Sequence, residues 1–496
     1  MFMLLKLKKL NNFLKNFFSA DKSLLIFFIV GFFSMFLVSN NKVLILMFFF
    51  LTLVLFFSLK KSVWDSVFLI FLLSIPFENT IREWCYQITT PLFDNISTSG
   101  YSLYFGLSIK IILAVFLFLL AIFRHKNINI KNDFGVFSLL IFLLIALINT
   151  FLMTNTTLPI LGLIRIWLGA WIFILSRLYF SKTKSVFFIF AIALYIFAIF
   201  FGGLQLIKQK PLGLYIELTP SFSKDDGYLT TDGEQQFRVS GFISHPVYFA
   251  SFLSILFPIF LGYFLKKIDK NTPILNINVF SLLSLMGCGV IVGTLSRSAL
   301  FTLILTLIIF RKEIFEKIFI RYYKYNNLKI KKIFKIFWLL FAIGLIYFLT
   351  PRIKSFGLIF QENGNASIRL ELIKQSFKMI YNNPLGVGLN NFTKELITYD
   401  LPENLNGFIV PVHNTFLIFF TELGILGGLF FVIFIFYIFF KEFNKKKKDL
   451  TDFGVWVGIL TFLINCQIHP LFNLDPTFDL LMLVLGYYSI CLYQKK

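Results

Sequence analysis

Apolar runs about as long as a bilayer is thick recur along the whole of this 496-residue chain. A helix needs about 20 apolar residues to cross the hydrocarbon core, where only helices and closed barrels satisfy every backbone polar group. Hydrophobic residues make up 57% of the sequence and Phe alone occurs 70 times, which exceeds the roughly 45–50% apolar content of soluble domains. The sequence therefore predicts an all-α, polytopic membrane protein.

The hydropathy pattern predicts about 12–14 transmembrane helices, of which fourteen can be delimited. These segments are residues 24–39, 43–59, 63–77, 104–123, 134–152, 158–180, 185–207, 246–265, 274–294, 298–310, 336–349, 414–440, 453–468 and 477–493. The third, tenth and eleventh are short for a span. No repeat or low-complexity tail divides the chain, so we predict a single integral membrane domain over 1–496.

Basic residues are divided unequally between the two sides of these spans. The N-terminus is basic and amphipathic and lacks a small-residue cleavage site, so we place it in the cytoplasm. The predicted cytoplasmic segments then hold 31 of the 47 Lys and Arg residues and the opposite segments hold 13, as the positive-inside rule requires. The net charge of +22 thus faces cytoplasm and anionic lipid, and nucleic acid is not a predicted partner.

The predicted outer side carries the long polar loops 78–103, 208–245 and 350–413. The last is the large extracytoplasmic loop of the domain and is predicted to contain a helix at about 366–381. Long loops in a compact chain are usually functional. ATP and nucleotide sugars are absent outside the cytoplasm, so a bond made there must draw on an activated, membrane-bound substrate.

Three of the outer segments carry arginine or histidine where a helix meets water. Arg238 and His245 precede the eighth span, Arg297 lies in the short turn before the tenth, and Arg369 and His413 lie in the last outer loop. Guanidinium groups bind a diphosphate in a bidentate fashion and stabilise charge on a departing phosphate oxygen. A neutral imidazole can remove a proton from an attacking sugar hydroxyl.

Each of these residues also has a structural interpretation. Arg238 and Arg369 could form solvated ion pairs with nearby acids, and Arg297 could be an interfacial anchor. His245 precedes Pro246, and we favour a role in capping the eighth span for it.

Two charged residues, Arg165 and Glu422, lie inside apolar runs. Arg165 lies within LPILGLIRIWLGAW and either pairs with an acid or binds a phosphate from below. Glu422, in FTELGILGG, favours helix packing and hydrogen bonding over acid catalysis, with Gly424, Gly427 and Gly428 allowing close approach. His469 lies in a short turn before Pro470. The four cysteines are scattered and predict neither a disulfide framework nor a metal site.

Four motifs in order resemble the O-antigen ligase and O-antigen polymerase superfamily. They are FRVSGFISHPVYFASFL, TLSRSALFTLIL, IRLELIKQSFKMIYNNPLGVGLNNF and HNTFLIFFTELGILGG, which together cover about 238–430. The sequence departs from that family in having His245-Pro246 where many relatives have Pro-Asn, and in two more predicted spans than the usual dozen.

The resemblance implies a bacterial cytoplasmic-membrane glycosyltransferase whose active site faces the periplasm or exterior. Its donor would be an undecaprenyl diphosphate-linked oligosaccharide, its acceptor a glycan, and it would use neither metal nor cofactor. Arg238, Arg297 and Arg369 would bind the diphosphate, and His413 would serve as the base or lie near it. Arg165 is a further candidate for binding the diphosphate or substrate, from its place within an apolar run rather than from the resemblance. The lipid bilayer, and for a polymerase a chain-length regulator, would be its further partners.

Two alternatives to a polymerase of surface polysaccharide stay open. A ligase would transfer the glycan to lipid A core, or in a relative to protein, whereas the long loop 350–413 suits a second oligosaccharide and favours polymerase. A flippase of lipid-linked sugar would place polar groups near the bilayer midplane and often shows two similar halves. Here Arg165 is the clearest midplane charge and the polar groups lie on one face, so the flippase is disfavoured.

Overall fold

The computed structural model describes most of the apolar segments and part of the outer loops. The described residues are 22–34, 43, 47, 50–51, 62–76, 109–124, 133–153, 157–214, 228–231, 234–243, 245–268, 272, 274–319, 365–399, 410–441, 449–473 and 475–490. The chain contacts divide into two compact units, each assembled from three segments. Unit 1 comprises 1–60, 180–351 and 447–461, and unit 2 comprises 61–179, 352–446 and 462–496.

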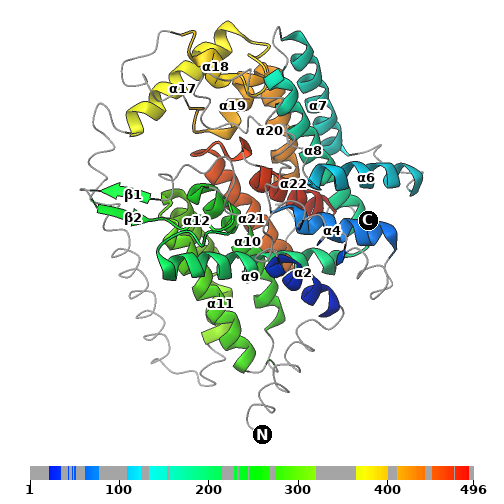
Figure 1. The fold of residues 1–496 in the computed structure, drawn as a ribbon, viewed down its shortest axis with the longest axis vertical. Coiled ribbons are helices and arrows are strands. Elements are labelled where there is room, and N and C mark those ends of the chain that lie inside the picture. Colours follow the sequence, from blue (N-terminus) through cyan, green and yellow to red (C-terminus); the bar gives the residue numbers. More distant parts are fainter. Residues whose placement is uncertain are drawn as a thin grey trace. The chain divides into compact units, whose positions relative to one another are not determined.

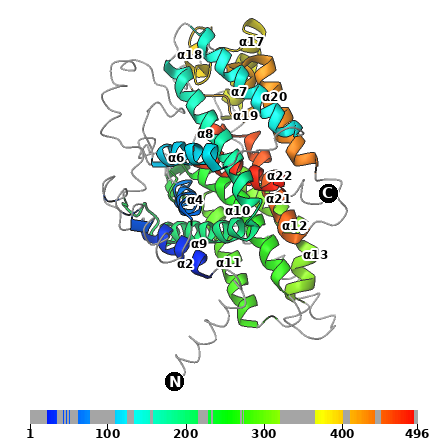
Figure 2. The same cartoon turned by 90° about the vertical axis from the view of Figure 1, so that its right-hand side faces the viewer.

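Helices make up nearly all of the described secondary structure (Figures 1 and 2). Unit 1 contains α2 (Lys22–Ser34), α9 (Lys184–Lys208), β1 (Tyr228–Thr231), β2 (Glu234–Phe237), α10 (Pro246–Lys267), α11 (Ile274–Gly293), α12 (Arg297–Ile309), α13 (Arg311–Ile314), η4 (Phe315–Phe319) and most of α21 (Leu450–Cys466). Unit 2 contains α4 (Val63–Ser74), α6 (Ile109–Arg124), α7 (Phe134–Leu152), α8 (Thr157–Phe180), α17 (Asn365–Asn382), α18 (Phe392–Leu396), α19 (Thr415–Glu422), α20 (Gly424–Lys441), η6 (Leu471–Asn473) and α22 (Asp475–Ile490).

The all-α, polytopic membrane fold is confirmed. Within the described residues six helices, α7 to α11 and α20, are long and apolar enough to cross a membrane, and several shorter apolar helices accompany them. Described helices lie at every predicted span except two. At 43–59 only four residues are described, all helical, and 336–349 lies outside the described residues. The single-domain organisation over 1–496 stays a prediction.

Small residues bring α10 and α21 of unit 1 into backbone contact. A Cβ on Gly454 would lie 2.5 Å from the Pro258 carbonyl oxygen, and one on Gly458 would lie 2.7 Å from that of Ile255. The Thr461 hydroxyl donates to the Ser254 carbonyl at 2.7 Å. Glycines four residues apart let membrane helices approach this closely.

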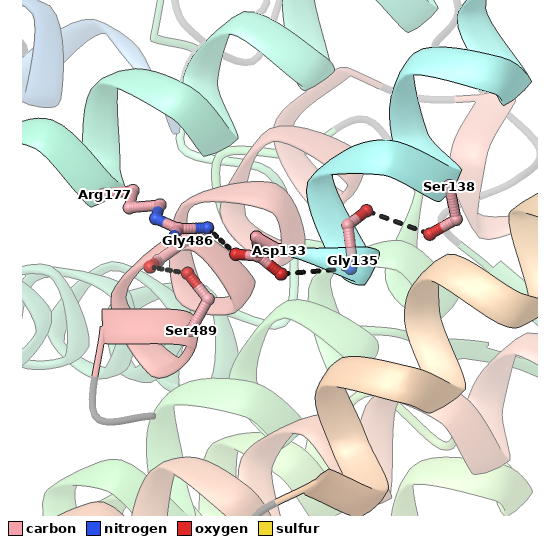
Figure 3. Close-up of polar contacts among 6 residues, drawn as sticks. All are labelled: Asp133, Gly135, Ser138, Arg177, Gly486 and Ser489. Atoms are coloured by element: carbon pink, nitrogen blue, oxygen red, sulfur yellow. Dashed lines mark hydrogen bonds and ion pairs between the residues drawn. The ribbon is translucent and has the colours of Figure 1, made fainter. Parts of the chain in front are cut away.

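Two ion pairs connect helices of unit 2. The Arg177 guanidinium in the last turn of α8 pairs with Asp133, the N-cap of α7, whose other oxygen accepts the Gly135 N–H at 3.0 Å (Figure 3). Lys110 of α6 pairs with Asp479 of α22 at 2.5 Å, and both side chains are at most 2% exposed. The charges of Lys110 and Arg177 inside apolar segments are thus neutralised within the unit, as a low-dielectric environment requires.

The predicted span 414–440 is wrong as one continuous helix. It breaks into α19 and α20 at Gly424, whose φ of +74° is in the left-handed region. The PLGVG turn after α17 supplies partners for the broken backbone. Val387 and Gly388 donate their N–H groups to the Thr421 and Glu422 carbonyls at 3.0 and 2.9 Å, and Ile425 donates to the Pro384 carbonyl at 3.0 Å.

The strands among the described residues, β1 and β2, form a two-stranded antiparallel hairpin. It lies in the predicted outer loop 208–245, with Tyr228 opposite Phe237 and Thr231 opposite Glu234. Its second strand ends directly before Arg238. By contrast, the helix predicted at about 366–381 is confirmed by α17.

Candidate functional site

Residues 238–241 of unit 1 are held between the end of α9 and the turn before α12. The Gln205 side chain donates to the Gly241 carbonyl at 2.9 Å and accepts the Gly241 N–H at 2.8 Å. Val239 donates its N–H to the Gly293 carbonyl at 3.0 Å. The Arg238 Nε donates to the Thr294 carbonyl oxygen at 3.1 Å. The half-buried Arg238 is therefore anchored to a turn that lies far from it in the sequence.

Arg297 is exposed at the first position of α12, directly after that turn. The turn contains Leu295 at φ +52°, a conformation that is uncommon for a leucine. The Thr294 hydroxyl stabilises the turn by donating to the Ile291 carbonyl at 2.7 Å and accepting the Ser296 N–H at 3.3 Å. Two predicted diphosphate-binding arginines are thus brought to one end of unit 1, although they come from separate loops of the sequence.

The capping role predicted for His245 is confirmed. His245 is the N-cap of α10, and its Nδ1 accepts the Val247 N–H at 3.2 Å, with Pro246 in the first turn. A side-chain acceptor at this position satisfies one of the free N–H groups of the helix start.

Arg369 and His413 lie in unit 2, on two segments that share a hydrophobic cluster. The cluster includes Ile368 and Leu372 of α17, Val412 of the extended segment before α19, and Ile418 of α19. Arg369 follows Ile368 and is half-buried, and His413 follows Val412 and is also half-buried. The packing of their neighbours holds both residues on adjoining segments.

The segment that carries His413 also contacts the turn after α21. Asn414 caps α19 by accepting the Leu417 N–H at 3.0 Å, and its amide donates to Gln467 at 3.2 Å. The Thr415 hydroxyl donates to the His469 carbonyl at 2.8 Å and accepts the Leu471 N–H at 3.0 Å. The sequence singled out neither Gln467 nor this role of the His469 turn, because both depend on contacts between segments that are distant in the chain.

Unit 2 contains a small pocket beside α19. Its volume is about 30 Å³, which is room for one or two water molecules. Its lining residues are Gly162, Arg165, Ile166, Leu389, Asn390, Thr415, Ile418, Phe419, Glu422 and Phe472. Arg165 of α8 and the buried Glu422 of α19 therefore place opposite charges on one pocket.

Asn390 connects the loop that lines this pocket to the start of α8. It has φ +59°, and its amide donates to the Leu158 carbonyl at the start of α8 at 3.3 Å. Gly162, one turn further along α8, leaves no space for a side chain, since a Cβ there would lie 2.7 Å from that of Leu389. The loop after the PLGVG turn is thus packed directly on α8 beside Arg165.

The predicted site residues form two groups. Arg238 and Arg297 belong to unit 1, and Arg165, Arg369 and His413 belong to unit 2. The first group offers two guanidinium groups at one helix end, and the second offers an arginine on α8, an arginine on α17 and an imidazole directly before α19. Convergence of the two groups on one cavity stays a prediction. Among the described residues, no three His, Cys, Asp or Glu side chains lie together as a metal site requires.

Part of the chain, which includes the Arg297 turn and the His413 segment, matches a known protein family. Residues 282–432 match the family model described as O-antigen ligase. The match extends from within α11, through the Arg297 turn, α17 and the PLGVG turn, to the broken helix α19–α20. No curated protein matches the chain. The match supports the resemblance of this part of the chain to the O-antigen ligase and polymerase superfamily.

Proposed function

We propose that the protein is a membrane glycosyltransferase of surface-polysaccharide polymerase type. It moves a glycan from an undecaprenyl diphosphate donor to a sugar hydroxyl on the outer face of the bacterial cytoplasmic membrane. The observation that carries this proposal is the bond from Arg238 to the turn that presents Arg297, because it gathers two cations at one helix end in a chain of this superfamily.

The proposed reaction is a single displacement at the anomeric carbon of the donor sugar. The acceptor hydroxyl oxygen forms the new glycosidic bond as the bond between that carbon and the diphosphate oxygen breaks. His413 takes the hydroxyl proton, as a general base must. Arg238, Arg297 and Arg369 stabilise the charge that develops on the leaving diphosphate, and no metal ion or cofactor takes part.

Arg165 contributes from the pocket beside α19. It shares this pocket with the buried Glu422, so the pocket brings a carboxylate of α19 to the part of α8 that carries Arg165. We therefore assign Arg165 the outer margin of the diphosphate site. It orients α19, and through Thr415 the His413 turn, more than it binds phosphate itself.

A polymerase must hold a second lipid-linked oligosaccharide as acceptor. The extramembrane helices α17 and α18 and their loop offer surface for it, which supports the polymerase. A ligase acting on lipid A core is the second candidate, because the matched family model is described as O-antigen ligase.

Deletion of the gene followed by analysis of surface glycan length tests both candidates. A polymerase predicts loss of all glycans longer than one repeat unit. Accumulation of long polymer on undecaprenyl diphosphate would instead establish the ligase. An unchanged glycan profile, with no transfer by the purified protein in lipid, would reject both.

A further inference from the structure

Opposite faces of α17 are both apolar, but only one of them is buried. Ile368, Leu372 and Met379 pack into the cluster described above. On the other side Leu370, Phe377 and Tyr381 are 60%, 61% and 87% exposed. Spacings of seven and four residues align these three side chains on one stripe of a helix, here called the α17 stripe. A contiguous exposed apolar surface of this kind marks an interaction site.

Two lysines flank the α17 stripe. Lys374 and Lys378 are exposed on the same side of the helix. Lys374 also pairs with Glu371 at 3.0 Å, the one described acid in contact with it. Aromatic and leucine side chains bordered by lysines are the composition of helices that lie in the headgroup region of a membrane.

The turn after α17 joins this stripe to helices that cross the membrane. The Leu385 carbonyl accepts from the Asn149 amide near the end of α7 at 2.8 Å, and the Pro384 carbonyl accepts the Ile425 N–H at the start of α20 at 3.0 Å. Leu385 itself is 68% exposed. The turn after α17 therefore lies at the end of unit 2 where α7 finishes and α20 starts (Figure 2).

The exposed apolar surface runs on from both of these helices. Phe151 and Leu152 at the end of α7 are exposed, as are Ile425 and Leu426 at the start of α20. Side chains of this kind at the end of an apolar span face lipid. Tyr381, at the end of α17, lies four residues before Leu385, so the last part of the α17 stripe is joined by a short turn to the ends of these spans.

From this continuity and from the flanking lysines we infer that α17 is an interfacial helix whose stripe rests on the membrane surface. The occupant is the anionic headgroup layer of the leaflet at this end of α7, which the predicted topology makes the outer leaflet. Leu370, Phe377 and Tyr381 insert below the phosphates, while Lys374 and Lys378 pair with anionic lipid. The inference does not rest on the proposed transferase activity.

Site-directed spin labelling of the full chain in vesicles tests the position of the stripe. Labels are placed by Phe377→Cys and Tyr381→Cys, with Asn382→Cys as the matched control, since Asn382 is exposed in the same turn but outside the stripe. Cys85 and Cys491 are changed to Ser, whereas Cys288 and Cys466 are buried. We expect labels at 377 and 381 to collide more with oxygen than with a water-soluble nickel chelate, and the label at 382 to show the reverse.

Lipid charge provides the second arm of the test. In vesicles of equal parts phosphatidylglycerol and phosphatidylcholine the labels at 377 and 381 should lie deeper than in pure phosphatidylcholine, and Lys374→Gln with Lys378→Gln should abolish that difference. Stronger collision with nickel than with oxygen at 377 and 381 would place the stripe in water and overturn the inference. Shielding of both labels from both reagents would overturn it too, because protein or bound glycan would then cover the stripe.

Discussion

Individual residues of the candidate site differ in how firmly the fold holds them. Arg238 is bonded to the Thr294 carbonyl and lies among residues pinned by Gln205. Arg297 follows that turn and is exposed, so a ligand at the helix start can reach its guanidinium. His413 is held through its neighbours Val412 and Asn414. These positions make single substitutions informative about each role.

His413→Ala should remove most of the transfer activity while the lipid-linked donor still binds. A general base contributes about 10²–10⁴-fold in rate, and we expect a loss of that size in glycan transfer by purified protein in lipid. Thr398→Ala, in an exposed turn of the same loop, is the control and should retain activity. Full turnover by the His413 variant would remove it from catalysis and leave an arginine-only site.

Arg297→Lys should also damage transfer although it keeps the positive charge. One ammonium cannot reproduce the planar two-point contact of a guanidinium with a diphosphate, and the loss of a charged hydrogen bond predicts roughly a 10–100-fold decrease in rate. Arg311→Lys, an exposed change in the predicted cytoplasmic segment, should have no effect. Equal activity of the two variants would show that Arg297 acts as a membrane anchor.

At the scale of elements, the decisive feature is the joint between α19, α20 and the PLGVG turn. The PLGVG turn donates backbone hydrogen bonds to the end of α19 and accepts one from the start of α20. The carbonyls at the end of α19 therefore find partners outside their own helix. A break inside a membrane protein persists only where the freed backbone groups are satisfied in this way. The joint sets the direction of α19 and hence the position of His413 at the start of that helix.

Gly424→Ala should destabilise this joint. Alanine at φ +74° costs about 1–2 kcal/mol, and its Cβ would lie 2.4 Å from the Pro384 carbonyl oxygen, so the turn must move as well. Thermal unfolding in detergent should show a lower midpoint. Gly203→Ala in α9 is the control, because a Cβ there meets nothing within 4 Å and helix propensity favours alanine. A midpoint unchanged by Gly424→Ala would mean that the joint is flexible.

At the scale of the whole molecule, the proposed mechanism depends on topology. Predicted outer segments and predicted cytoplasmic segments are distinguished by the charge split of 13 to 31. A cysteine at position 400 should react with a membrane-impermeant reagent in intact cells, and a cysteine at position 320 should react only after the cells are opened. The reverse pattern would place the whole site in the cytoplasm and exclude the mechanism.

The convergence of Arg297 and His413 is a second prediction at this scale. A shared diphosphate site requires them within about 15 Å, the reach of one diphosphate and a short-range charge interaction. Arg297→Cys with His413→Cys should therefore be joined by a bifunctional thiol reagent of that length. Arg311→Cys with His413→Cys is the control, since the hydrocarbon core of about 30 Å should separate these positions. Absence of cross-linking in the first pair would reject a single site.

The sequence alone was sufficient for features that depend on neighbouring residues. Long apolar runs predict membrane helices because each span satisfies its own backbone, and most of them coincide with described helices. The α17 helix and the His245 cap were predictable for the same reason, since their signals lie within a few residues. The resemblance to the superfamily rested on four motifs, and the family match over 282–432 supports it for the last three of them.

Only the tertiary structure decided which distant segments meet. Nothing in the apolar run 414–440 predicts the break at Gly424, because the partners of its backbone lie in the PLGVG turn, a separate and earlier segment of the chain. Arg165 and Glu422 share a pocket although they lie in opposite halves of the sequence. Hydropathy is a property of each residue and its near neighbours, whereas these contacts depend on packing between helices, which several arrangements of the same spans could satisfy.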